Sequence, residues 1–137
     1  MSTELNNKTV AILATDGFEY VELVEPKKAL EAAGAKTVVI SPKDGQIKGW
    51  NHTDWGESVP VDLNLNSARE SDFDALVLPG GVMNPDHLRQ NKTAVAFVKS
   101  FFEAHKPVAA ICHGPLVVGR GRSRTRKETN FLAFASN

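Results

Sequence analysis

Cys112 is the residue whose position in this sequence best suits covalent chemistry. It is the single cysteine of the chain, and it follows the apolar run Pro107–Ile111 directly, with His113, Gly114 and Pro115 after it. A nucleophile on a tight turn between a strand and a helix is lifted clear of the sheet, and the helix N-terminus favours its thiolate. The pattern therefore indicates a cysteine nucleophile. The alternative is a small, inert cysteine buried at the end of a strand.

Two carboxylates lie early in the chain, at Glu19 and Glu22 in the segment GFEYVEL. Residues three apart at the start of a helix lie near the same face. We expect that face at the end of the first strand, next to the strand that leads to Cys112. A carboxyl group there can orient the thiol or act as acid or base. The alternative is that both side chains only stabilise the positive end of the helix dipole.

A pair of glycines, Gly80 and Gly81, follows the apolar run Ala75–Leu78 and Pro79. Glycine lets the backbone approach a ligand closely and can turn an N–H group toward it. The pair is therefore a candidate part of a binding site, although a plain turn explains the same residues.

The other histidines, His52, His87 and His105, have no spacing to one another or to Cys112 that is typical of metal ligands. We therefore predict no metal site. His105 closes a predicted helix, where a cation stabilises the dipole. His87 is close enough to the glycine pair to line the same cleft, but a structural role is favoured for all three.

The elements that must position these residues begin with a strand, a helix and a second strand. The apolar runs Lys8–Ala14 and Lys36–Ile40 are typical of strands buried on both faces of a parallel sheet. Between them, Val21–Ala33 is helix-like, and Gly34 suits the residue after its end. Together they predict a right-handed βαβ unit.

Within this helix, Val21, Val24 and Leu30 are predicted to face one side. Pro26 is tolerated most easily in a first helical turn, so the regular helix is predicted to begin around Leu23.

Further along the chain, Asp44–Asn66 carries both tryptophans without a helical period and is predicted to be irregular or a small hairpin. Ala75–Leu78 and Pro107–Ile111 are predicted strands, and Lys92–His105 is a predicted amphipathic helix. The apolar stripe of that helix consists of Val95, Val98, Phe101 and Phe102. Three strand ends run into DGFE, PGG and CHGP, and ligands bind at the carboxyl ends of parallel strands.

Length and composition limit the class of protein. The 137 residues are 42% hydrophobic and 23% charged, as in one globular domain. No apolar run approaches the roughly 18 residues of a membrane span, and the first residues lack the regions of a signal peptide. A single cysteine excludes an intrachain disulfide framework and fits a reducing compartment. We predict a cytoplasmic protein with no membrane partner.

Charge divides the chain in two. Of its 16 basic and 16 acidic residues, five basic and one acidic lie in residues 119–137, so this segment carries net +4 and residues 1–118 carry net −4. We predict an incomplete α/β domain over residues 1–118 and a divergent basic tail over residues 119–137. The acidic body gives no reason to expect a nucleic-acid partner.

Three segments together resemble the DJ-1/PfpI family, in its PfpI-type branch of C56 intracellular protease-like proteins. They are VAILATDGFEYVELVEP (10–26), DALVLPGG (74–81) and KPVAAICHGP (106–115). The excursion over residues 43–63 is also similar to bacterial members. The match covers about residues 8–118.

The resemblance implies a flavodoxin-like α/β fold of the class I glutamine amidotransferase type, with a doubly wound, mostly parallel sheet. It implies that Cys112 is the nucleophile, that Glu22 is the carboxyl group that holds it, and that Glu19 is a second carboxylate at the cleft. His113 is implied either as a base or through its backbone N–H.

The resemblance also implies an oxyanion site formed by the backbone N–H groups of His113 and of Gly80 or Gly81. It implies a cysteine-dependent hydrolase, or a glyoxalase- or deglycase-like stress protein, acting on a small carbonyl compound or a peptide. No cofactor or metal is implied, and homo-oligomers are expected. A glutaminase is disfavoured because no histidine follows His113.

The pattern of the family does not continue beyond about Gly119, so a truncated or frameshifted product is one hypothesis. Two alternatives to an enzyme follow. The first is a non-catalytic redox sensor in which Cys112 is oxidised reversibly. The second is an inactive fragment with a solvated basic tail.

Overall fold

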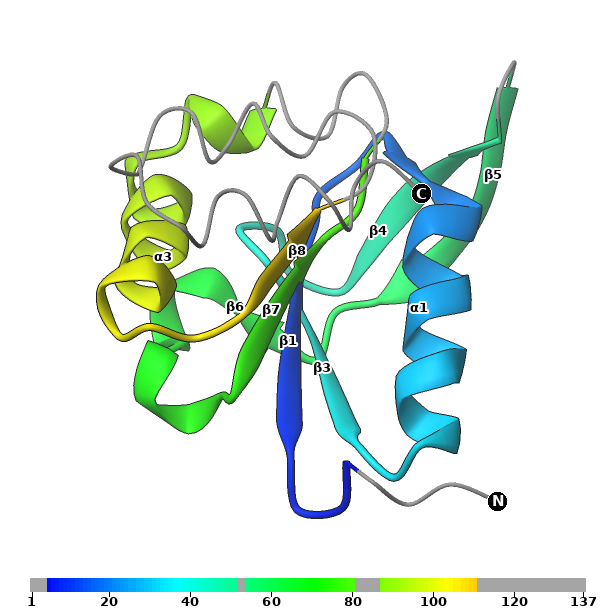
Figure 1. Ribbon diagram of the computed structural model, residues 1–137. Coiled ribbons are helices and arrows are strands. Elements are labelled where there is room, and N and C mark those ends of the chain that lie inside the picture. Colours follow the sequence, from blue (N-terminus) through cyan, green and yellow to red (C-terminus); the bar gives the residue numbers. More distant parts are fainter. Residues whose placement is uncertain (1–4, 52–53, 81–86, 111–137) are drawn as a thin grey trace.

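The computed structural model describes residues 5–51, 54–80 and 87–110. The predicted tail over residues 119–137 lies outside them. The helices, 3₁₀ turns and strands are, in chain order, β1 Thr9–Leu13, β2 Phe18–Glu19, α1 Tyr20–Ala32, β3 Lys36–Ser41, β4 Gln46–Asn51, β5 Asp54–Pro60, β6 Leu63–Asn64, η1 Leu65–Ser67, η2 Glu70–Asp72, β7 Ala75–Leu78, α3 Lys92–Glu103 and β8 Val108–Ala110 (Figure 1).

A five-stranded sheet with the order β6-β3-β1-β7-β8 forms the centre, and each neighbouring pair is parallel. The helix α1 covers one face and α3 covers the other (Figure 1). On β1, Ala11 and Leu13 join the core beneath α3, whereas Val10 and Ile12 join the core beneath α1. This alternation buries the strand on both sides. The predicted flavodoxin-like α/β fold with a mostly parallel sheet is confirmed.

The helix α1 differs from its prediction at its first turn. It begins at Tyr20 rather than around Leu23, and it runs through Pro26. Proline costs the helix one hydrogen bond, but packing of the buried Leu23 holds the turn before it in place. Val21 is predicted to share one side of the helix with Val24 and Leu30. Its side chain is 47% exposed, whereas Val24 and Leu30 pack against the core beneath α1.

The helices α1 and α3 end in the same local motif. After α1, the N–H groups of Gly34 and Ala35 donate to the carbonyls of Glu31 and Leu30, and Gly34 has a φ of +99°. This is a Schellman motif, which needs a left-handed residue. The helix α3 ends at Glu103 in the same way.

In the second motif, His105 takes the left-handed position with a φ of +61°. His105 therefore lies beyond the helix that it was predicted to close. At the other end of α3, Asn91 caps the helix by accepting from the N–H of Ala94 at 3.0 Å.

The segment that carries the tryptophans is an ordered hairpin. The strands β4 and β5 pair antiparallel, and β2 pairs with β4 in parallel to complete a second, three-stranded sheet. Trp50 and Trp55 face each other across the hairpin, with ring centroids 5.2 Å apart and planes at 87°. The hairpin alternative of the prediction is thus confirmed, but the pairing with β2 was not foreseen.

Asp16 joins this hairpin to the end of β1. Its carboxylate accepts from the Lys48 N–H at 2.7 Å and from the Lys43 ammonium at 2.9 Å, and the Gly17 N–H donates to the Lys48 carbonyl at 2.8 Å. Burial opposes ionisation, but the Lys43 and Lys48 hydrogen bonds and the charges of Lys43 and His87 outweigh it. The pKa of Asp16 therefore lies below its usual value.

Replacing Asp16 by asparagine tests this clamp. A carboxylate whose folded-state pKa is depressed stabilises the fold above its unfolded pKa, and that stability is lost as the pH falls through the folded pKa. Asp16→Asn should lower the free energy of unfolding by about 1 kcal/mol at pH 7, and the deficit should shrink below about pH 4. Urea unfolding of both proteins at pH 7 and pH 3 measures it. Lys43→Met should lose a smaller part, and an equal Asp16→Asn deficit at both pH values would contradict the assignment.

Candidate active site

The carboxyl ends of three neighbouring strands define the candidate site. β1, β7 and β8 lie side by side and parallel in that order. The chain leaves β1 toward Asp16, leaves β7 toward Gly80, and leaves β8 at Ala110, two residues before Cys112. The expectation that the strand leading to Cys112 lies next to the first strand is wrong, because β7 lies between them. The turn after β7 is therefore flanked by the other two strand ends.

Glu22 contacts this middle turn directly. Its carboxylate oxygen Oε1 accepts a hydrogen bond from the Gly80 N–H at 2.9 Å, in a partly buried position. The contact joins the first turn of α1 to the end of β7, 58 positions apart in sequence. Glu22 also lies in the turn where an acidic residue stabilises the helix dipole. This placement is compatible with both predicted roles of Glu22, as a carboxyl group that acts on the thiol and as a charge that stabilises the helix dipole.

Glu19 holds the other side of the same glycine. Its backbone N–H donates to the Gly80 carbonyl at 3.1 Å. Glu19 is the N-cap of α1, and its side chain makes no capping hydrogen bond. The N–H and the carbonyl of Gly80 are thus both bound to the first turn of α1 and its cap. The structure brings Glu19, Glu22 and Gly80 together.

The hydrogen bonds of Gly80 decide which glycine of the pair is available as an oxyanion donor. The Gly80 N–H already donates to Glu22, so Gly81 is the better candidate for an oxyanion donor. Gly81 lies outside the described residues, as do Cys112, His113 and His52. Their predicted roles stay predictions.

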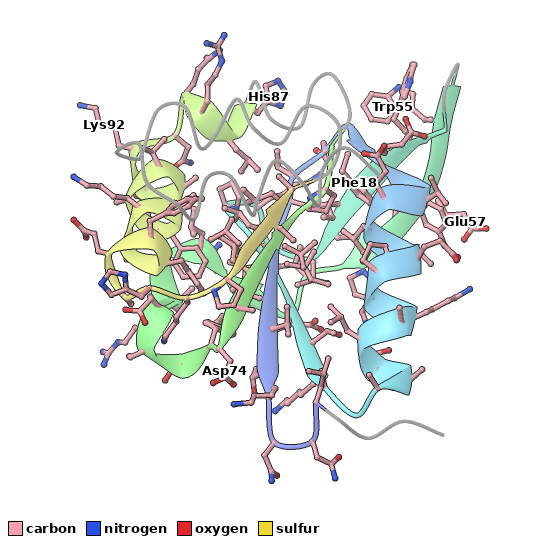
Figure 2. The ribbon with its side chains drawn as sticks, in the orientation of Figure 1. Phe18, Trp55, Glu57, Asp74, His87 and Lys92 are labelled. Carbon is pink, nitrogen blue, oxygen red and sulfur yellow. The ribbon has the colours of Figure 1, made fainter. Side chains whose placement is uncertain are left out.

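The two described histidines lie in different places. His87 lies toward the carboxyl edge of the sheet (Figure 2), and its charge contributes to the lowered pKa of Asp16. His105 lines a cavity together with Lys106 and Pro107, where the chain enters β8 at the opposite edge of the sheet. Within residues 5–51, 54–80 and 87–110, no group of three or more metal-ligating side chains occurs.

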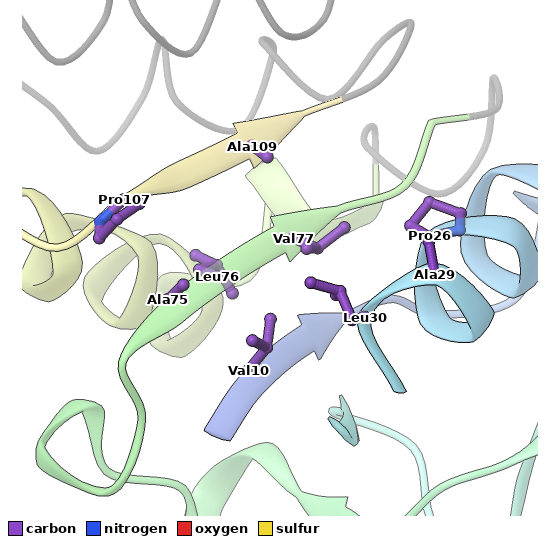
Figure 3. Close-up of a pocket in the computed structure, with 9 residues that line it drawn as sticks. All are labelled: Val10, Pro26, Ala29, Leu30, Ala75, Leu76, Val77, Pro107 and Ala109. Carbon is purple, nitrogen blue, oxygen red and sulfur yellow. The ribbon is translucent and has the colours of Figure 1, made fainter. Parts of the chain in front are cut away.

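A cavity of about 340 Å³ lies on the α1 face of the sheet. Figure 3 shows side chains from β1, β7, β8 and α1 around it, among them Val10, Leu30, Val77 and Ala109. Each of the lining residues is apolar, so this space offers no acid, base or nucleophile from the described residues. The candidate acid–base groups among the described residues, Glu19 and Glu22, lie instead at the carboxyl edge of the sheet.

The sequence reasoning missed the contribution of the hairpin to this edge. The sequence places Asp16 only in the DGFE segment after the first strand, and its bonds to Lys43 and Lys48 connect two elements that sequence spacing does not relate. The Tyr20 hydroxyl likewise donates to the Glu57 carboxylate at 3.1 Å, which raises the pKa of Tyr20 through this bond, burial and the charge of Glu57. The sequence signal that could have identified Asp16 is its position as a carboxylate shortly after the end of a strand.

Fold and site together define a class: flavodoxin-like α/β proteins with a carboxyl group fixed beside the turn that follows a central strand. The model of the DJ-1/PfpI family matches residues 8–135. This chain belongs to the DJ-1/PfpI family.

Known relatives agree with this assignment. The chain is 44% identical over 112 residues to the Bacillus subtilis protein named "Putative cysteine protease YraA", with 82% of this chain and 64% of that protein aligned. It is 43% identical over 126 residues to "Deglycase TK1284" of Thermococcus kodakarensis, with 91% and 73% aligned. The chain thus spans less than two thirds of the first of these proteins.

A solved structure from Anabaena variabilis is similar in fold. It is a two-domain protein with DJ-1/ThiJ/PfpI-like and ferritin-like domains. The TM-score is 0.75 at 38% identity, and the match covers 84% of this chain and 32% of that one. Among the described residues, no helix is long and apolar enough to cross a membrane.

Removal of the Glu22 carboxylate tests the central contact. Glu22→Ala leaves the Gly80 N–H without this acceptor, and we expect its amide hydrogen to exchange about tenfold faster. Glu22→Gln keeps an acceptor oxygen and should preserve most of the protection. Amide exchange followed by NMR measures both variants. Unchanged protection of Gly80 in Glu22→Ala would show that the contact does not hold this turn.

Proposed function

We propose that this protein is a cysteine-dependent enzyme that acts on the carbonyl carbon of small carbonyl compounds, in the manner of a deglycase. Cys112 is the nucleophile and Glu22 the acid and base. One observation carries the proposal: the Glu22 carboxylate is bound to the turn after β7, and β7 is the neighbour of the strand that ends two residues before Cys112.

The relatives support the same chemistry. One is named a deglycase and another carries the name of a cysteine protease. Both kinds of reaction begin with attack by a thiolate on a carbonyl carbon. The names differ in substrate, and a peptide remains the second substrate class.

The proposed first step needs no cofactor. A lone pair of the Cys112 thiolate forms a C–S bond with the carbonyl carbon, and the carbonyl π pair moves onto the oxygen. Glu22 has first taken the thiol proton of Cys112, and it now gives that proton to the oxygen, so an aldehyde becomes a hemithioacetal and Glu22 is again a carboxylate. The backbone N–H groups of His113 and Gly81 would stabilise the developing charge. Reversal returns the proton to Glu22 and restores the thiolate.

Glu22 suits this role because of how it is held. One carboxylate oxygen accepts from Gly80, which fixes the orientation of the carboxyl plane and directs the second oxygen. A carboxyl group anchored in this way is already oriented for proton transfer, so no conformational freedom has to be lost in the reaction. Glu19 is proposed as the second carboxylate near the cleft, placed by its own backbone bond to Gly80.

We further propose that the active form is a homo-oligomer. Val21 and Trp55 are large apolar side chains that are 47% and 43% exposed. Tyr20, next to Val21, is bonded to Glu57 on the strand that carries Trp55. Exposed aromatic and aliphatic side chains of this kind are typical of contact surfaces.

Turnover of a small dicarbonyl compound tests the function. With methylglyoxal as the probe, the protein should consume substrate catalytically and form a mass-detectable adduct on Cys112. Cys112→Ser should abolish both. Glu22→Gln should reduce turnover by about 100-fold while leaving the Gly80 contact in place, because glutamine accepts from Gly80 but cannot transfer the proton.

The outcomes separate the candidate functions. Consumption of methylglyoxal that survives in Cys112→Ser would overturn the proposed nucleophile. An oxidised Cys112 that forms once per chain, with no turnover, would instead indicate a redox sensor. Neither adduct nor oxidation in a protein with a cooperative melting transition would reject both.

A further inference from the structure

Gly49 on β4 lies in a crowded position of the second sheet. A Cβ atom placed there would lie 3.0 Å from the Glu57 carbonyl oxygen, 3.1 Å from Cζ of Phe18 and 3.2 Å from Cβ of Tyr20. Each distance is shorter than ordinary van der Waals contact between carbon and its neighbours. The backbone of β4 is thus approached from two sides, by β5 and by the segment that leads into α1.

The Phe18 and Tyr20 contacts belong to the segment that positions the site. Phe18 pairs with Gly49 in the register of β2 and β4, and Glu19 pairs with Trp50. Phe18 is fully buried and lies near the start of α1 in Figure 2. The residue between Phe18 and Tyr20 is Glu19, whose N–H holds the Gly80 carbonyl. Any shift of β2 is therefore transmitted to Gly80.

The hairpin itself is held at the residues around Gly49. The Lys48 N–H and carbonyl are bound by Asp16 and Gly17, and Glu57 on β5 accepts from the Tyr20 hydroxyl. Figure 2 shows Glu57 beside α1. The register of β4 and β5 shifts between Lys48 and Trp50. Added bulk at Gly49 therefore presses on the Glu57 carbonyl of β5 and also on Phe18 and Tyr20, and the last two contacts pass the displacement to β2 and the first turn of α1.

We propose that Gly49 is a positioning residue for Glu22. The absence of a side chain at this position lets β2 lie close against β4, and that closeness sets the position from which the first turn of α1 reaches Gly80. The proposal rests on the proposed function only for its catalytic consequence. The structural part, from Gly49 to Gly80, rests on the contacts of Gly49 and the hydrogen bonds of Gly80 alone.

The test compares two glycines of the same hairpin region. Gly49→Ala adds the crowded methyl group. Gly45→Ala is the matched control, because its Cβ would meet nothing within 4 Å although its φ of +83° makes alanine strained there. Gly45→Ala therefore destabilises the turn before β4 without pushing on β2.

We expect Gly49→Ala to speed exchange of the Gly80 amide hydrogen about fivefold and to lower turnover of methylglyoxal, whereas Gly45→Ala changes neither beyond its effect on global unfolding. The exchange rate of the Gly80 amide hydrogen is measured without substrate, and kcat measures the effect on catalysis. Tyr20→Phe, which removes the bond to Glu57 without adding atoms, should speed Gly80 exchange in the same direction and replaces Gly49→Ala if that variant does not fold.

The two readouts distinguish the proposals. Faster Gly80 exchange without a change in kcat would uphold the positioning by Gly49 and count against Glu22 in catalysis. Unchanged Gly80 exchange in a folded Gly49→Ala protein, or equal acceleration in Gly45→Ala, would overturn the proposal.

Discussion

The two hydrogen bonds that join Gly80 to the start of α1 are the contacts on which the site depends. The Glu22 carboxylate accepts from its N–H and the Glu19 N–H donates to its carbonyl. The two bonds act on the two successive peptide groups to which Gly80 contributes, and together they fix the position and orientation of this turn. A carboxylate is thereby held at the carboxyl edge of the sheet, where water would otherwise compete for its orientation. The chemistry proposed for the protein needs this fixed carboxyl group.

The rest of the fold serves this contact from two directions. The parallel order of β1, β7 and β8 brings three strand ends to one edge, with the turn of Gly80 in the middle. The second sheet approaches from the side, because β2 pairs with β4 immediately before α1 begins. Asp16 connects both parts by binding Lys43 and Lys48. The hairpin of β4 and β5 therefore helps to hold the first turn of α1 and the end of β1 in position.

Much of the fold could be predicted because buried strands carry a strong local signal. The runs around β1, β3 and β7 are apolar on both faces, and the parallel pairing of β1 with β3 follows from the intervening helix α1. The long-range pairs could not be predicted in this way. The bond from Glu22 to Gly80 joins residues that no local pattern relates, and the pairing of β2 with β4 depends on the missing side chain of Gly49. The start of α1 was placed too late because Pro26 was given more weight than tertiary packing.

The rate of Cys112 alkylation as a function of pH, measured in the native protein and in denaturant, tests the central claim most directly. An organised site at the carboxyl edge predicts a native midpoint well below the free-thiol value of about 8.5, and a return to that value in denaturant. Coinciding profiles under the two conditions would contradict the account, because they would mean that the fold around Glu22 and Gly80 organises no thiol.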